Sequence, residues 1–195
     1  MSTYGNNTIK LTHGLNLHNQ LTKQLFEALR SRDSEIVLRE MDATGMLTTI
    51  IPELETGRGF IQPTLHYYDV LNHNLSTVGA FDRLLKQNEW SNIFRKNINW
   101  DEISAILEKK IDGLSIEVLL RLGCLLHDVG KPNSAIEKNE RIVFPKHGLI
   151  GSNLISSRLD KIGLEASSKN FVRLVKLSAM EWFFNCFGCL LYTSA

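Results

Sequence analysis

This sequence has few cysteines, few prolines and no excess of either charge. Each of these features excludes some classes of protein. The 195 residues include 3 cysteines, too few for a disulfide framework, and 4 prolines, too few for a long proline-rich linker. The 22 basic and 21 acidic residues leave a net charge of +1, so no global field draws the chain to nucleic acid or membrane. Because the N-terminus lacks the basic and apolar regions of a signal peptide, we expect a reduced, cytoplasmic setting.

The three cysteines form no recognisable metal or redox motif. Cys124 lies in an apolar segment, where we expect it to be a small core residue. Cys186 and Cys189 make a single Cys-x-x-Cys pair. Without a second pair or a nearby βαβ pattern, this pair favours neither zinc binding nor disulfide exchange.

Apolar residues recur at helical spacing through most of the chain, which predicts an all-α fold. Leu17, Leu21, Leu25 and Leu29 recur every four residues and predict one amphipathic helix. Capping residues predict the start of others, with Asp33, Thr64 (for a long helix over 65–87), Asp101 and Ser115 as the caps. The polar residues 137–140 separate two short apolar stretches, so we expect a small β-hairpin near residues 135–144.

The stretch from Leu119 to Pro132 combines an apolar helix with an abrupt stop. Leucines at helical spacing predict a buried helix, and Gly130 and Pro132 are stop signals, so His127 and Asp128 fall on its last turn. An imidazole and a carboxylate aimed at one point are natural ligands of a metal ion. A cation at the helix C-terminus beside a solvated acid is the structural alternative, and spacing alone leaves both open.

The run His127-Asp128-Val129-Gly130-Lys131-Pro132 resembles the signature of the HD superfamily of metal-dependent phosphohydrolases. The resemblance implies an HD-type helical bundle and a further histidine ligand on an earlier helix, for which His73 is available. With His73, His127 and Asp128 as ligands, the mixed nitrogen and oxygen set suits Mn, Fe, Zn, Co or Ni better than Mg.

A longer resemblance covers roughly residues 25–175 and points to the region behind the catalytic head of tRNA nucleotidyltransferases, the CCA-adding and poly(A) polymerase-like family. It rests on residues 45–47 (Gly-Met-Leu), 51–54 (Ile-Pro-Glu-Leu), Gln62 and the run 66–75, in that order. No Gly-Ser pair followed by an Asp-x-Asp strand marks the catalytic head. In that family the helical region mostly grips RNA, which makes tRNA an alternative partner.

The resemblances and the positions of nearby residues suggest further site residues. Phe144, His147 and Gly151 match a Phe-x-x-His-x-x-x-Gly run whose histidine lines the active cleft or binds a second metal, whereas simple exposure is the alternative for a histidine at a helix start. Lys131 is the expected phosphate ligand, with Arg158 as a weaker candidate. Two further residues are expected near the metal ligands without binding the ion. Asp69 either orients an imidazole through a hydrogen bond or is a solvated acid, and His66 lies at the mouth of the cleft.

The C-terminal part departs from the HD pattern, which needs a closing aspartate on a later helix. No aspartate follows Asp160, and Lys176 and its neighbours stand where a histidine is usual. Residues 181–195 form an apolar tail, shorter than the roughly 20 residues of a membrane span. Its end, residues 189–194, resembles a translated sequencing adapter, so we expect the natural chain to diverge after about Lys176 and to be longer.

We therefore predict a mobile arm over residues 1–16, a helical lead-in over 17–62, an HD domain over 63–180 that is incomplete at its end, and the tail 181–195. The predicted function is metal-dependent hydrolysis of a phosphoester, in a phosphorylated small molecule such as a nucleotide or at an RNA end. The expected catalytic residues are His127, Asp128, Lys131 and His147.

Two other functions remain open on the sequence alone. One is the RNA-binding body of a tRNA nucleotidyltransferase without its head, whose basic face would comprise Lys146, Arg158, Lys161, Lys169, Arg173 and Lys176. The other is an inactive HD domain that is used as a scaffold. Bound metal would separate the enzyme from the scaffold, and salt-dependent tRNA binding would support the RNA-binding body.

Overall fold

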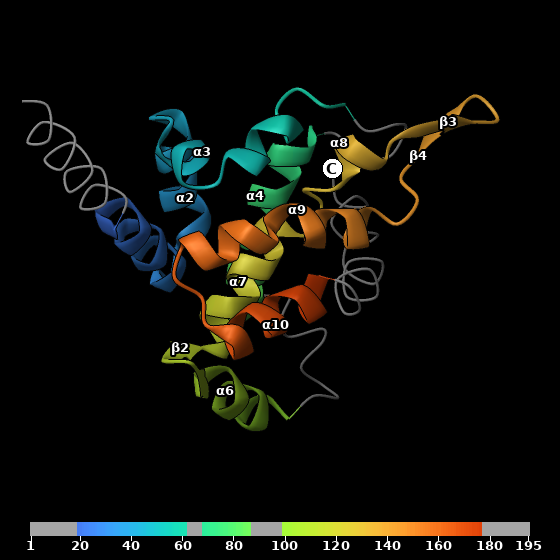
Figure 1. Cartoon of the computed structure of the whole chain (residues 1–195). Helices are drawn as coiled ribbons and strands as arrows, with labels where there is room; N and C mark the ends of the chain where they lie inside the picture. The colour runs from blue at the N-terminus through green and yellow to red at the C-terminus, as the bar shows by residue number, and fades with distance from the viewer. Residues whose placement is uncertain (1–18, 62–67, 87–98, 177–195) are drawn as a thin grey trace, which may run out of the picture.

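The computed structural model describes residues 19–61, 68–86 and 99–176 (Figure 1). Helices dominate this part of the chain, and its strands pair only into two short antiparallel hairpins. The prediction of an all-α fold with a small hairpin is confirmed. The predicted arm and tail and His66 lie outside the described residues, and the domain boundaries stay a prediction.

The first half of the described chain is a series of short helices that leads to one long helix. A helix over residues 19–30 is followed by α2 (Ser34–Ala43), α3 (Met46–Ile50), the 3-10 helix η1 (Pro52–Gly57) and α4 (Val70–Leu85). Gly45 separates α2 from α3 with a φ of 73°, a left-handed conformation that glycine adopts without strain. Pro52 begins η1, where its missing N–H removes no hydrogen bond.

The second half surrounds the apolar helix that the leucine spacing predicts. Its elements are α6 (Trp100–Glu108), β1 (Lys110–Ile111), β2 (Leu114–Ser115), α7 (Ile116–Leu126), α8 (Lys131–Ser134), β3 (Ile136–Lys138), β4 (Arg141–Val143), α9 (His147–Lys161) and α10 (Ala166–Leu174). The predicted hairpin is β3–β4, which pairs Ile136 with Val143 and projects from the body of the molecule (Figure 1). Its turn residues Asn139 and Glu140 both have positive φ, as a tight two-residue hairpin requires.

The β1–β2 hairpin is absent from the sequence prediction, although its signal is present. Asp112 and Gly113 have φ of 50° and 81° and connect the two strands. An Asp-Gly pair between apolar residues is a strong local indicator of such a turn. The hairpin delivers Ser115 to the start of α7, where its hydroxyl accepts a hydrogen bond from the N–H of Val118 as predicted.

Two other helix starts differ from the prediction. The long helix begins at Val70 rather than near residue 65, because Asp69 is its N-cap and accepts a hydrogen bond from the N–H of Asn72 at 2.7 Å. Asp69 also pairs as extended backbone with Ile61, which keeps it out of the helix. Helix α6 is capped by the side chain of Asn99, and Asp101, the expected cap, lies in its first turn.

Helix α7 lies at the centre of the described fold, with α4 and α10 packed against it (Figure 1). Its leucines 119, 122, 125 and 126 are fully buried, as the spacing predicts, and join leucines of α2 and α4 in one core. Burying a leucine side chain stabilises a fold by about 1.5–3 kcal/mol, so these four leucines contribute strongly to the packing of α7. The run of buried leucines ends at Leu126, and His127 follows directly.

An ion pair inside this core ties four helices together. Asp82 on α4 accepts hydrogen bonds from the Ser34 hydroxyl, from the N–H of Glu35 and from Nε of Arg121 at 2.8 Å. Arg121 on α7 also donates to the carbonyl of Leu29. All these groups find partners within the protein, which a buried charge requires.

Within the described residues, none of the helices combines the length and the apolar character needed to cross a membrane.

Candidate metal centre

The end of α7 turns sharply into α8, and the turn carries three polar side chains that are all buried. Nδ1 of His127, the residue that ends α7, lies 2.8 Å from the carbonyl oxygen of Cys124. The N–H of Lys131 donates to the carbonyl of Asp128 at 2.9 Å. These backbone contacts fix the orientation of His127 and bring Asp128 and Lys131 to the same side of the turn.

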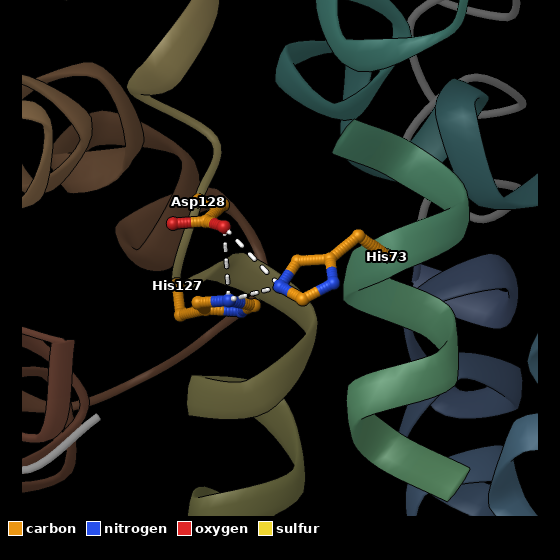
Figure 2. A group of neighbouring side chains, drawn as sticks. All are labelled: His73, His127 and Asp128. Atoms are coloured by element: carbon orange, nitrogen blue, oxygen red, sulfur yellow. Dashed lines mark hydrogen bonds and ion pairs between the residues drawn. The ribbon is translucent and has the colours of Figure 1, made fainter. Parts of the chain in front are cut away.

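Three predicted metal ligands meet at this turn (Figure 2). His73 projects from the first turn of α4, His127 from the end of α7, and Asp128 from the backbone that follows (Figure 2). Nε2 of His73 and Nε2 of His127 are 3.2 Å apart. Oδ2 of Asp128 lies 3.4 Å from the first nitrogen and 3.1 Å from the second.

This triangle has the size that a metal ion demands. Two ligand atoms about 2.1 Å from one ion, seen from it at about 90–110°, stand roughly 3.0–3.4 Å apart. The three separations between His73, His127 and Asp128 fall in that range. The residues therefore fit a divalent ion, to which they would offer two nitrogens and one oxygen.

The protonation of His127 supports the same arrangement. A carbonyl oxygen only accepts hydrogen bonds, so Nδ1 of His127 carries a hydrogen toward Cys124. In the neutral imidazole the lone pair is then on Nε2, the atom that faces His73 and Asp128. A backbone partner on the other ring nitrogen is the usual way in which a metal-binding histidine is oriented.

Lys131 and His147 complete a ring of cationic and imidazole groups around Asp128. Nζ of Lys131 lies 2.6 Å from Oδ2 of Asp128, and Nε2 of His147 lies 3.4 Å from Oδ1. Nδ1 of His147 faces the carbonyl of Phe144 at 3.0 Å, which directs its Nε2 inward in the same way as for His127. The structure thus brings together all four predicted catalytic residues.

Opposing effects act on the Asp128 carboxyl. Its burial raises the pKa, but the neighbouring His127, Lys131 and His73 outweigh the burial and hold the pKa well below the ordinary value. The carboxylate is therefore ionised at neutral pH, as a metal ligand must be. Burial also acts on Cys124, where it raises the thiol pKa to about 12, so this cysteine is the inert core residue that was expected.

The approach of α9 to the turn depends on two glycines in contact. A Cβ on Gly130 would overlap the carbonyl oxygen of His147 and would lie 2.5 Å from the backbone nitrogen of Gly151. A Cβ on Gly151 would lie 2.8 Å from the nitrogen of Gly130. Both positions leave room only for hydrogen, and this close approach places His147 against Asp128.

Sequence reasoning missed one residue beside this cluster. Lys176 was expected on a basic surface, yet its side chain is buried, with 4% of its surface exposed, and its Nζ packs against Gly151. The buried Nζ has no hydrogen-bond partner. Burial lowers its pKa to about 7, and the negative charge of Asp128 opposes that change. Only the proximity of Gly151 reveals this site, and no local pattern around Lys176 signals it.

Two other predicted site residues have partners away from the triad. Arg158 pairs with Glu53 on η1 at 3.0 Å and lies eleven residues after His147 on α9. Asp69 uses its two oxygens on the N–H groups of Asn72 and Gly59, so it holds the start of α4. His66 lies outside the described residues.

The expected basic face is also interrupted. Lys176 is buried, Arg158 and Lys169 pair with Glu53 and Asp160, and Arg173 donates to the Ser152 hydroxyl. Side chains that are held by internal partners are less available to a phosphate backbone. The described residues therefore give weaker support to an RNA surface than the sequence suggested.

Comparison with known proteins finds a relative but no matching family. No protein-family model matches the chain. The chain is similar to the A-adding tRNA nucleotidyltransferase of Deinococcus radiodurans, with 28% identity over 161 residues, or 81% of this chain and 31% of that protein. The chain therefore spans about a third of the length of this relative. The match supports a region related to tRNA nucleotidyltransferases, in agreement with the longer resemblance in the sequence.

Proposed function

We propose that this chain carries an HD-type domain, over about residues 63–180, that hydrolyses a phosphoester with the help of a divalent metal ion. The proposal depends chiefly on one observation. His73, His127 and Asp128 come from separate parts of the chain, and their ligand atoms lie 3.1–3.4 Å apart. Such a triangle has the size that a divalent ion bound by two imidazole nitrogens and one carboxylate oxygen requires.

The ligand set favours Mn, Fe, Zn, Co or Ni over Mg, since imidazole nitrogen suits the transition metals. When bound, such an ion would lower the pKa of a water molecule toward neutrality and polarise a phosphoryl oxygen. His73, His127 and Asp128 would hold it, with Cys124 fixing the ring of His127 from behind. Three protein ligands leave further positions for water and substrate.

The remaining residues have roles that suit a phosphoester. Lys131 is close enough to Asp128 to hold a phosphoryl oxygen beside the ion. Hydrolysis forms a bond from the water oxygen to phosphorus and breaks the bond from phosphorus to the ester oxygen, which then needs a proton. His147, whose Nδ1 already donates to Phe144, can carry that proton on Nε2 and deliver it to the leaving oxygen.

The test begins with metal content and then turns to activity. Purified wild-type protein and the Asp128→Asn variant are compared for bound metal by mass spectrometry and for release of phosphate from nucleotides, 2′,3′-cyclic phosphates and phosphorylated RNA ends. We expect transition metal and activity in the wild type only. A metal-free wild type that binds no added Mn²⁺ would contradict the proposal. The Arg158→Gln variant is the control, since Arg158 pairs with Glu53 away from the triad.

A second candidate function rests on the comparison with known proteins. The relative is an A-adding tRNA nucleotidyltransferase, and the chain matches only 31% of it. The chain would then be a helical body that grips tRNA for a catalytic head. We would expect tRNA affinity that falls steeply with salt and is unchanged in Asp128→Asn. Affinity for tRNA that is equal to the affinity for any polyanion would count against this function.

The closing aspartate decides between an active enzyme and an inactive scaffold. The described residues supply three ligands, and no aspartate follows Asp160 in this sequence. With three ligands the domain should bind metal more weakly than with four. If the protein binds Mn²⁺ but hydrolyses none of the phosphoesters above, the scaffold becomes the better interpretation.

A further inference from the structure

Lys176 poses a physical problem that the proposed metal site does not solve. Its side chain is buried, and its Nζ has no hydrogen-bond partner. A buried ammonium group without a partner costs several kcal/mol, and lysine avoids such positions unless it is paired. The four-carbon stem is long enough to reach solvent from many helix positions, yet here it ends inside the protein.

The surroundings of Lys176 connect it to the cluster around Asp128. Its Nζ packs against Gly151, one turn after His147 on α9, and Gly151 itself contacts Gly130. Asp128 is close enough for its charge to act on the Lys176 ammonium. The terminal amine of Lys176 therefore lies next to the turn that carries Asp128 and Lys131, on the side that faces α9.

The charges of this cluster indicate which ligand it suits. Among the described residues, one carboxylate, Asp128, contacts three imidazoles and Lys131, and Lys176 adds a second ammonium. A divalent ion would add two further positive charges. An excess of this size attracts a ligand with two or more negative charges, and a phosphate group has both the charge and the acceptor oxygens for two lysines.

We propose that Lys176 binds a phosphoryl oxygen and, together with Lys131, forms a phosphate site against the turn between Asp128 and Gly130. The inference rests on the proposed function for the view that this phosphate belongs to a substrate. The binding of phosphate itself needs no metal and no reaction. The glycine at position 151 then has a clear purpose, because a side chain there would occupy the place of the Lys176 amine.

The test measures binding of inorganic phosphate to the full chain in the presence of a chelator, at pH 6.5, by titration calorimetry. Wild type is compared with Lys176→Met, which keeps the length and apolar stem, and with Lys138→Met, which removes an exposed lysine of the β3–β4 hairpin. We expect Lys176→Met to weaken phosphate binding roughly tenfold or more, the effect of losing a hydrogen bond to a charged group. Lys138→Met should bind as the wild type does.

Stability separates a ligand-binding lysine from a structural one. Without phosphate, Lys176→Met should unfold at a higher temperature than the wild type, because it removes a buried charge that has no partner. Equal phosphate affinity in wild type and Lys176→Met, or a lower unfolding temperature for the variant, would overturn the inference. Should the variant fail to fold, nitrogen NMR of the lysine amines in the wild type gives the answer, since phosphate must then shift the Lys176 signal.

Manganese binding by the same proteins keeps the two proposals apart. If Lys176→Met binds Mn²⁺ as the wild type does but loses phosphate, both proposals are supported. If neither protein binds Mn²⁺ and phosphate binding still depends on Lys176, the metal-dependent function fails while the phosphate site stands. If Mn²⁺ binds and phosphate affinity ignores Lys176, the phosphate site alone fails. Phosphorylated RNA ends and free nucleotides then identify the source of the phosphate.

Discussion

Two aspartates of this protein are almost equally buried and are surrounded very differently. Asp82 on α4 is 3% exposed and Asp128 after α7 is 2% exposed. Asp82 accepts from a hydroxyl, a backbone amide and a guanidinium, none of which changes protonation near neutral pH. Asp128 faces three imidazoles, a residue type that binds metal ions, and the amine of Lys131.

The comparison teaches that burial of a charge does not by itself indicate function. The chemistry of the partners distinguishes the two sites. Donors with fixed protons make Asp82 a joint between helices, whereas titratable groups that converge on Asp128 leave room for an added cation or anion. The predictions that follow test whether Asp82 has a structural role and Asp128 a ligand-binding role.

The largest effect is expected at the Asp82 joint. Replacing Arg121 with Met leaves Asp82 buried without its guanidinium, and breaking a buried pair costs about 3–5 kcal/mol of unfolding free energy. Urea denaturation followed by circular dichroism measures the loss. The double variant Asp82→Leu with Arg121→Met should recover part of it, since no charge is left unpaired. A single variant as stable as the wild type would show that the joint contributes little.

The second effect concerns metal, and it should be confined to the Asp128 site. Saturating Mn²⁺, at about 100 times its dissociation constant, should stabilise the wild type by about 2.7 kcal/mol. The His127→Ala and Asp128→Ala variants should fold, with unchanged helical circular dichroism, but gain no stability from Mn²⁺. Thermal unfolding with and without Mn²⁺ tests this. Equal stabilisation of the variants would place the ion elsewhere.

The third prediction tests the contact that brings His147 to Asp128. Gly130→Ala forces a methyl group into the backbone of α9 and should cost about 1–3 kcal/mol, as overpacking does. It should also weaken Mn²⁺ binding by displacing the turn. Gly79→Ala is the matched control, because the methyl group there meets the ends of two flexible side chains, Glu35 and Arg83, and no backbone. If both variants behave alike, the close approach of Gly130 is not needed.

The fourth prediction concerns Lys176 and pH. Since burial lowers its pKa to about 7, the unfolded chain binds more protons than the folded one above pH 7, and wild-type stability should rise as pH increases from 7 toward 10. Lys176→Met should lack this rise and should be more stable by about 1–3 kcal/mol below pH 7. Urea denaturation at pH 6 and pH 9 measures both effects. An unchanged pH profile in the variant would show that the rise has another source.

The smallest effect is expected at the caps of α4 and α7. Asp69→Ala and Ser115→Ala should each cost about 1 kcal/mol, as the loss of an N-cap does. Only Asp69→Ala should also weaken Mn²⁺ binding, because His73 lies in the first turn that Asp69 holds. Equal Mn²⁺ affinity in the two variants would leave Asp69 with a structural role alone.

The sequence predicted what depends on local patterns. Leucine spacing gave the buried helix α7, and the stop signals after it placed His127 and Asp128 at its end. The convergence of His73 with this pair is different, because 54 residues separate His73 from His127. Periodicity does not show which helices meet, so that expectation came from the HD resemblance.

The failures have physical causes of the same kind. Asp69 caps α4, and its bridge with Ile61 forms only in the folded chain, so no local pattern could show that the helix begins there. Lys176 has the pattern of a surface residue, and its burial depends on Gly151 and α9, which no local pattern reveals. Arg158 finds Glu53, 105 residues earlier, and this pairing removes it from the predicted substrate site.

The contact between Gly130 and Gly151 also constrains how such a sequence can change over time. Each glycine leaves room for the backbone of the other, so a side chain gained at one position is tolerated only if the other segment shifts first. Single substitutions that are harmless elsewhere in the turn or in α9 would be eliminated at these two sites. The turn and the helix must therefore evolve as one unit, and a library that randomises both positions should return glycine pairs far more often than chance.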